Sequence, residues 1–201
     1  MATPTYKEIT MIKGNGLLLI SITLFPQIST ALDNNEALSL NCNGCHGPNG
    51  ISAGQSIPSI AGLNARYFMR TMMRFRKGER DSTIMDRISK GYKISELRKI
   101  SDYFSSLDWI NAKADIDQNL VTRGHEIHKE LCEECHENNG RHQDKEIPRI
   151  SGQAGNYLYL QMKDYYNGSP AMPQPDKMKD RMATLDLKDL EALSHFYSSG
   201  K

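Results

Sequence analysis

The sequence predicts an all-α protein made of two similar domains in tandem, and three observations lead to that prediction. The chain of 201 residues repeats itself at a nearly constant offset. Apolar residues recur at helical spacing in each half. No stretch alternates between apolar and polar residues as a half-buried strand does. A duplicated helical domain accounts for all three observations.

The internal repeat becomes visible when the second half of the chain is laid on the first. Cys42-Asn-Gly-Cys45-His46 matches Cys132-Glu-Glu-Cys135-His136 at an offset of 90 positions, and beyond Gly78 the offset becomes 93. Further matched pairs are Pro58 with Pro148, Gly62 with Gly152, Tyr67 with Tyr157, Met85 with Met178 and Phe104 with Tyr197. A register that persists through so many residue types indicates duplication.

Each half is expected to contain three short helices joined by loops. The expected helices are residues 35–42, 64–76 and 94–107 in the first half, and residues 122–133, 156–166 and 187–197 in the second. Helical periodicity is lost near residues 107–119, so the domains are predicted to cover residues 32–110 and 116–201. We expect a pseudo-twofold axis to relate them.

The first 31 residues are predicted to be an export signal that is removed. Lys7 and Lys13 precede an apolar run from Gly16 to Phe25, and a small-x-small pattern ends at Ala31. The run is shorter than a membrane span, which disfavours the alternative of a retained anchor. A periplasmic protein with no stable membrane insertion is therefore expected.

The charge balance excludes partners that need a strongly basic protein. Without Lys7, Lys13 and Glu8, the 25 basic and 24 acidic residues become 23 of each. No basic excess points to nucleic acid, and no polybasic run points to a membrane surface.

Two Cys-x-x-Cys-His motifs carry the chemistry of the chain. This motif is the attachment signature of c-type haem: two thiols meet two vinyl groups, and the next residue brings an imidazole to the iron. The attaching residues are thus Cys42 and Cys45 for one haem and Cys132 and Cys135 for the other, with His46 and His136 as iron ligands. We predict two covalently bound haem c groups.

Two other uses of paired cysteines are less compatible with the sequence. A zinc-binding structural module would need the two pairs close together, whereas 87 positions separate Cys45 from Cys132. A thioredoxin-like redox pair would lie in a βαβ pattern, which this sequence lacks.

The sixth iron ligands are expected from methionines, since a thioether is a common partner of histidine in electron-transfer haems. Met85 lies 39 positions after His46, in an expected loop before the last helix, and Met178 lies 42 positions after His136 at the matching place. Met172 and Met182 remain alternatives in the second half. With both axial positions filled, the chemistry is one-electron transfer, and no catalytic residues are expected.

Four further residues have open interpretations. Pro58 and Pro148 each lie 12 positions after a motif histidine, and each either accepts a hydrogen bond from that imidazole or only stiffens the loop. His125 and His128 share a helix face and either bind a metal or are solvated, and the sequence favours solvation.

The motifs resemble those of the class I dihaem cytochromes c over residues 36–199, through Ile57-Pro-x-Ile60-x-Gly62 and the methionine before the last helix. The stretch Ser82–Tyr92 resembles the haem subunit of flavocytochrome c sulfide dehydrogenase, as does Gly124-x-x-x-His128 before the second motif. That resemblance implies His46 and Met85 on the first iron, and His136 and Met178 on the second. The segment 168–177 departs from the family.

The resemblance also implies partners. The family binds an FAD-containing flavoprotein, which oxidises sulfide and passes electrons to the haems, and a downstream cytochrome or oxidase then accepts them. The near-neutral charge favours a permanent subunit, because a shuttle is usually steered by a strong charged patch. The alternative is a free-standing dihaem carrier that delivers electrons to a terminal oxidase.

Overall fold

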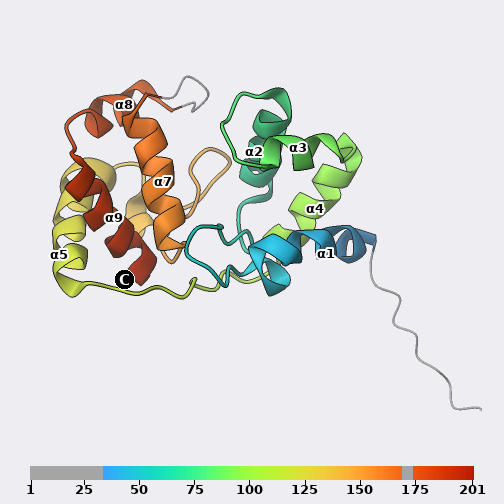
Figure 1. The fold of residues 1–201 in the computed structure, drawn as a ribbon, viewed down its shortest axis with the longest axis horizontal. Coiled ribbons are helices and arrows are strands. Elements are labelled where there is room, and N and C mark those ends of the chain that lie inside the picture. The colour runs from blue at the N-terminus through green and yellow to red at the C-terminus, as the bar shows by residue number, and fades with distance from the viewer. Residues whose placement is uncertain (1–33, 169–173) are drawn as a thin grey trace, which may run out of the picture. The chain divides into compact units, whose positions relative to one another are not determined.

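The computed structural model describes residues 34–168 and 174–201, and within them the chain is helical and contains no strand (Figure 1). The regular elements in chain order are α1 (Asn34–His46), η1 (Pro48–Gly50), α2 (Ala65–Lys77), α3 (Met85–Lys90), α4 (Ile94–Ser106), α5 (Gln118–Ile127), η2 (His128–Cys132), α6 (Glu137–Gly140), α7 (Gly155–Tyr166), α8 (Asp176–Met182) and α9 (Leu187–Ser199). The predicted export signal, residues 1–31, lies outside the described residues.

The first half builds its core between α1, α2 and α4. α1 packs on α4, and α2 packs on both α3 and α4. The side chains of Leu97, Ile100 and Phe104, which follow one another at intervals of three and four residues on α4, are fully buried. The Phe68 ring from α2 stacks on Phe104, with 5.9 Å between the ring centroids.

The second half has a separate core between α5, α7 and α9. Leu190, Leu193 and Phe196 of α9 occupy its centre. α5 and α9 cross closely at Gly124, where a Cβ atom would lie 2.2 Å from the carbonyl oxygen of Ala192. A glycine is therefore required at this crossing.

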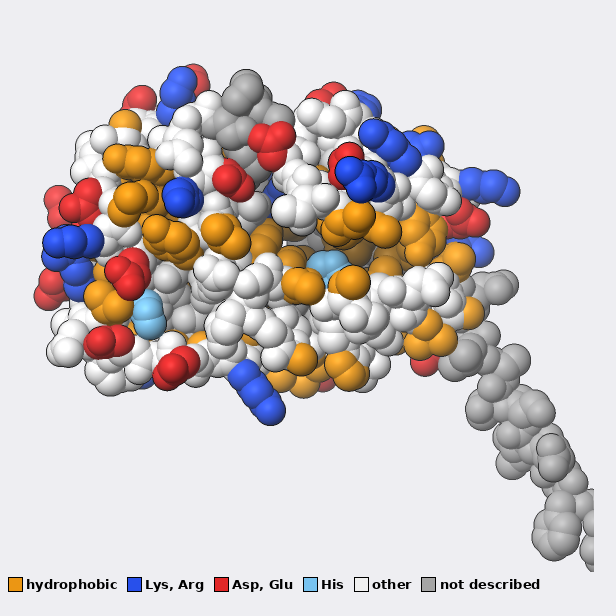
Figure 2. All heavy atoms as spheres, viewed as in Figure 1, with side chains coloured by type: hydrophobic (Ala, Val, Ile, Leu, Met, Phe, Trp, Pro, Cys, Tyr) orange, Lys and Arg blue, Asp and Glu red, His pale blue; other side chains and the backbone are white. Residues whose placement is uncertain are grey.

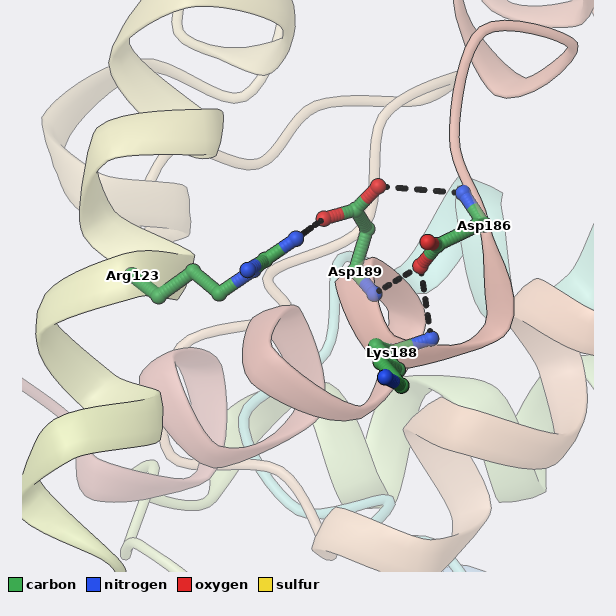
Figure 3. A network of polar contacts seen from close by, with 4 residues as sticks. All are labelled: Arg123, Asp186, Lys188 and Asp189. Atoms are coloured by element: carbon green, nitrogen blue, oxygen red, sulfur yellow. Dashed lines mark hydrogen bonds and ion pairs between the residues drawn. The ribbon is translucent and has the colours of Figure 1, made fainter.

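The start of α9 is fixed by side chains that also bind α5 (Figure 3). The Asp186 carboxylate accepts hydrogen bonds from the backbone N–H groups of Lys188 and Asp189. The Asp189 carboxylate accepts from the backbone N–H of Asp186 at 3.0 Å, which completes a capping box. The guanidinium of Arg123 on α5 donates to Asp189 at 2.6 Å and so joins the two helices.

The sequence repeat recurs in the backbone hydrogen bonds. In the first half the N–H groups of Ile60 and Ala61 donate to the Gly50 carbonyl, and in the second half those of Ile150 and Ser151 donate to the Gly140 carbonyl. The N–H of Gly62 donates to Phe104, and the N–H of Gly152 donates to Tyr197. Matched residues therefore make matched bonds.

The two halves contact each other through polar groups from loops and helix starts. The side chain of Gln153 bonds the backbone of Ser59, and the side chain of Gln143 bonds the backbone of Gly62 and Asn64. The backbone N–H of Tyr157 donates to the Gln55 carbonyl at 2.8 Å. Residues 108–117, between α4 and α5, contain no helix.

The observed helices extend beyond several predicted limits, and the two ligand candidates do not lie in loops. α1 continues through the first cysteine motif, and α5 begins at Gln118 because the Asp117 carboxylate accepts from the N–H groups of Asn119 and Leu120. Met85 is the first residue of α3 and Met178 lies in α8. Both helices are too short for their periodicity to be recognised in the sequence.

Candidate haem sites

The four cysteines form two pairs of free thiols, each beside its own core. Cys42 and Cys132 are partly buried and pack against the first and second core cluster, whereas Cys45 and Cys135 are exposed. Burial, with a smaller effect of the neighbouring Cys45, raises the pKa of the Cys42 thiol to about 11. Each pair thus combines one thiol beside a core with one thiol at the surface.

Local helical structure sets the geometry of the motifs. Cys42, Cys45 and His46 all lie on α1, where residues three and four apart share a face. In the second half, η2 ends at Cys132, and the N–H groups of Cys135 and His136 donate to the Cys132 carbonyl at 3.2 and 2.9 Å. One turn of chain therefore holds both thiols and the imidazole in each half.

The imidazole of His46 is buried and held by the loop that contains Pro58. Its Nδ1 lies 2.8 Å from the Pro58 carbonyl oxygen, which can only accept, so Nδ1 carries the proton and Nε2 is free to bind a metal. Burial lowers the pKa of His46, although the Pro58 carbonyl opposes this effect. The carbonyl-acceptor interpretation of Pro58 is confirmed.

His136 differs from its counterpart. Its Nδ1 is buried and has no hydrogen-bond partner among the described residues, so the matching interpretation of Pro148 is wrong for this structure. Burial, followed by the charges of His128 and His142, lowers the pKa of His136 to about 4. The imidazole is therefore neutral at physiological pH, which is the form that binds a metal.

The two methionine candidates lie beside the same cores as the cysteines. Met85 packs against the first core cluster, as does Cys42, and Met178 packs against the second, as does Cys132. Met182, an alternative in the second half, is buried within that cluster itself. Met172, the other alternative, lies outside the described residues.

These residues fit haem c. Each half of the structure has two free thiols, a neutral imidazole and a partly buried thioether, and one of the thiols and the thioether pack against the core of that half. Such a set matches a flat apolar ring held by two thioether bonds and two axial ligands. Nowhere in residues 34–168 and 174–201 do three or more His, Cys, Asp or Glu side chains gather as a zinc site requires.

The solvated-surface interpretation of His128 is wrong. The side chain is fully buried: Nδ1 lies 2.9 Å from the Tyr197 hydroxyl and Nε2 contacts the Glu133 carboxylate. Burial raises the pKa of the Cys132 thiol, and the Tyr197 hydroxyl opposes this effect. The repeat indicates that His128 is buried, because apolar residues stand at the matching positions of the first half: Leu38 matches His128 and Phe104 matches Tyr197. His125 is half-buried and its ring stacks on Phe196.

Comparisons with known proteins agree with this site. No protein-family model matches the chain. The cytochrome subunit of sulfide dehydrogenase from Chlorobaculum tepidum is 38% identical over 95 residues, which are 47% of this chain and 86% of that protein. Cytochrome c4 from Azotobacter vinelandii is 27% identical over 175 residues, covering 77% of this chain and 82% of that one.

A solved structure gives the fold. The crystal structure of reduced recombinant cytochrome c4 from Pseudomonas stutzeri superposes with a TM-score of 0.71, at 24% identity, and the match covers 82% of this chain and 97% of that chain. The all-α, two-domain arrangement predicted from the sequence is confirmed by this likeness. Among the described helices, none has the length and apolar character needed to cross a bilayer.

Proposed function

We propose that this chain, which belongs to the class I dihaem cytochromes c, is the electron-accepting haem subunit of a periplasmic, sulfide-oxidising flavocytochrome. The chain carries two covalently bound haem c groups and transfers electrons; its relatives are electron-transfer cytochromes. In the proposed complex, an FAD-containing partner oxidises sulfide. A reduced flavin releases two electrons, and two one-electron centres accept both of them.

The residues that hold the haems are proposed to be those of the two motifs. Cys42 and Cys45 attach the first haem and Cys132 and Cys135 the second, while His46 with Met85 and His136 with Met178 bind the irons. Held by these residues, a haem would supply one-electron chemistry at its iron. The chain fixes the His46 ring through Pro58, and in each half an apolar core cluster lies beside the cysteine motif, where it would pack against the haem.

Domain limits follow from the same proposal. Residues 32–110 and 116–201 each bind one haem, and residues 1–31 direct export and are removed. Separate core clusters in the two halves, with no residue in common, support the division. Intact mass should give a chain that begins near Leu32 plus two haems. A dominant native species with one haem would contradict the duplicated site.

Methionine ligation has its own test. Ferric haem with a histidine and a methionine ligand shows a weak near-infrared band that depends on the sulfur–iron bond. Met85→Ala and Met178→Ala should each remove about half of it. If Met178→Ala leaves the band intact while Met172→Ala halves it, the assignment in the second half is wrong.

The observation that carries the sulfide proposal is the 38% identity to a sulfide dehydrogenase cytochrome subunit. The exposed side chains of Ile84 and Ile88, on either side of Met85 and Arg87, supply an apolar surface next to the proposed first haem. Apolar surface next to a haem suits a lasting contact with a partner. This surface lies in the stretch Ser82–Tyr92 that resembles the flavocytochrome subunit.

A free-standing carrier that delivers electrons to a terminal oxidase is the second candidate, and charge distribution favours it. The neutral total conceals an imbalance: residues 32–107 contain 11 basic and 7 acidic side chains, and residues 108–201 contain 12 and 16. Lys and Arg gather over α3 and α4 in Figure 2. Opposite charges on the two halves would steer brief encounters with partners.

Purification from the source organism separates the two candidates. The subunit proposal expects a flavoprotein that stays with this chain through gel filtration at high ionic strength, and a complex that reduces both haems when sulfide is added. If the chain elutes free of flavin in both low and high salt, the free-standing carrier is the correct function.

A further inference from the structure

Arg80 is a buried cation at the contact between the two halves. Only 8% of the residue is exposed. Its Nη1 donates to the Tyr67 hydroxyl at 3.4 Å, and its Nη2 donates to the Tyr157 hydroxyl at 3.2 Å and to Gln161 at 2.6 Å. The guanidinium carbon lies 5.2 Å from the centre of the Phe75 ring.

The direct hydrogen-bond partners of Arg80 among the described residues are all uncharged side chains. Arg80 forms no ion pair with a carboxylate among the described residues. Its Nε is buried without a hydrogen-bond partner there. Tyr157 remains a neutral hydroxyl, since burial raises its pKa to about 12. The nearby Asp164 carboxylate makes no ion pair with Arg80; it accepts a hydrogen bond from Gln161, the residue to which Arg80 also donates.

A buried guanidinium with neutral partners is costly. The effective desolvation penalty of a buried ion is several kcal/mol, and an anion with good hydrogen-bond geometry offsets it. The free Nε donor shows that the hydrogen bonding of Arg80 is incomplete. A carboxylate is the group that a guanidinium binds best, often through two parallel hydrogen bonds.

Haem c brings carboxylates of its own, because every haem carries two propionates. We propose that Arg80, assisted by the hydroxyls of Tyr67 and Tyr157, binds a haem propionate buried between the two halves. The proposal rests on the two haems of the chain and not on the identity of its redox partner.

The repeat makes this site unique within the chain. Tyr67 and Tyr157 are matched residues, so both halves contribute a hydroxyl to one cation. The counterpart of Arg80 is Pro170 at an offset of 90 and Pro173 at an offset of 93, so in the sequence the second half has no matching arginine. A single cation thus connects a cofactor with residues of both halves.

The consequence for the haem follows from charge. An ionised propionate stabilises ferric iron, which has one more positive charge than ferrous iron, and thereby lowers the reduction potential. Arg80 neutralises that propionate and raises the potential. It is a positioning residue for the cofactor and a determinant of its potential.

The test compares Arg80→Gln with Arg76→Gln in the full dihaem protein. Arg76 is the matched control, since it lies on α2 and, among the described residues, donates to the backbone carbonyls of Ser89, Lys90 and Tyr92. Arg80→Gln should lower the reduction potential of one haem by more than Arg76→Gln does. That potential should then rise at low pH, where the unpaired propionate takes up a proton. Arg80→Lys should retain most of the wild-type potential.

Infrared difference spectra between the oxidised and reduced protein give a second readout. The carboxylate bands of a propionate should shift in Arg80→Gln and, by less, in Arg80→Lys, while Arg76→Gln leaves them in place. If Arg80→Gln does not accumulate with two haems, the shift in Arg80→Lys decides. Potentials and carboxylate bands that change no more than in Arg76→Gln would overturn the proposal and leave Arg80 as a structural cation.

Discussion

The side-chain amide of Gln153 pairs with the backbone of Ser59 through two buried hydrogen bonds. Its Oε1 accepts from the Ser59 N–H at 2.7 Å and its Nε2 donates to the Ser59 carbonyl at 2.9 Å. The two residues are 94 positions apart, one in each half. Gln143 makes the same kind of pair with the Asn64 N–H and the Gly62 carbonyl, but is only partly buried.

The two glutamines should differ in their contribution to stability. Gln153→Ala leaves a buried donor and acceptor without partners, so we expect a loss of roughly 2–4 kcal/mol in the free energy of unfolding. Gln143→Ala should cost less, about 1 kcal/mol, because water reaches the freed groups. Urea unfolding of the holoprotein, followed by circular dichroism, measures both. Equal losses would contradict the role of burial.

The polar cluster of the second half is expected to act as a unit. His128→Leu and Tyr197→Phe restore the residue types at the matching positions of the first half, Leu38 and Phe104. Each single change removes the 2.9 Å hydrogen bond between Nδ1 of His128 and the Tyr197 hydroxyl and leaves the remaining group buried without that partner. We expect each to lower the free energy of unfolding by about 1–3 kcal/mol. The double variant should cost less than the sum by roughly 0.5–3 kcal/mol. Additive losses in urea unfolding would show that the two side chains are independent.

The sequence predicted the elements that repeat and that are long enough to show a period. The helices at residues 65–77, 155–166 and 187–199 agree with expectation within about three residues at each end, because their apolar faces are regular. The cysteine motifs were recognised because spacing alone defines them. The short helices α3 and α8 were missed, since six or seven residues contain too few turns.

The polar groups at the junction could not be predicted in the same way. Gln153, Gln143 and Arg80 all bond residues that are 77 or more positions away. Nothing in the local sequence distinguishes a buried glutamine from an exposed one, because its partners are backbone groups of another loop. His128 is different. Its counterpart in the first half, Leu38, indicates a position in the core, but a histidine side chain is usually expected at the surface.

The link between α5 and α9 should depend on pH in the acidic range. Burial alone would raise the pKa of Asp189, but the hydrogen bonds from Arg123 and the Asp186 N–H outweigh it and hold the pKa below its ordinary value of 3.8. The ionised carboxylate is therefore the form that the fold prefers. Its contribution to stability is present above pH 3.8 and is lost as pH falls through the folded-state pKa.

Asp189→Asn removes the carboxylate charge that joins α9 to Arg123 on α5, and Lys188→Gln serves as the control. At pH 7 the variant should unfold at a lower urea concentration than the wild type, and the difference should vanish below the folded-state pKa. Lys188→Gln is the control, because only its backbone N–H takes part in the cap. If the Asn variant matches the wild type at pH 7, the carboxylate charge contributes nothing to the stability of α9.

The last prediction concerns the partner surface beside the proposed first haem. Ile84 and Ile88 are 45% and 43% exposed. Arg87, which lies between the two isoleucines in the sequence, and Lys90, which follows them, are also exposed, so the surface is both apolar and basic. Such a surface suits a partner patch that is apolar at its centre and acidic at its rim. Ile88→Glu should weaken binding to a flavoprotein from the source roughly tenfold or more, since about 1.4 kcal/mol is a factor of ten.

Leu160→Glu is the matched control for this change, because Leu160 is 43% exposed but lies on α7 of the second half. It should leave the affinity unchanged. Arg87→Glu should slow association and reduce its dependence on salt while changing dissociation little, because a charge at the rim acts mainly on encounter. Surface plasmon resonance at two ionic strengths measures all three variants. A contact centred on α3 predicts a loss of affinity for Ile88→Glu and none for Leu160→Glu. Equal losses for the two variants would show that the contact is not centred on α3.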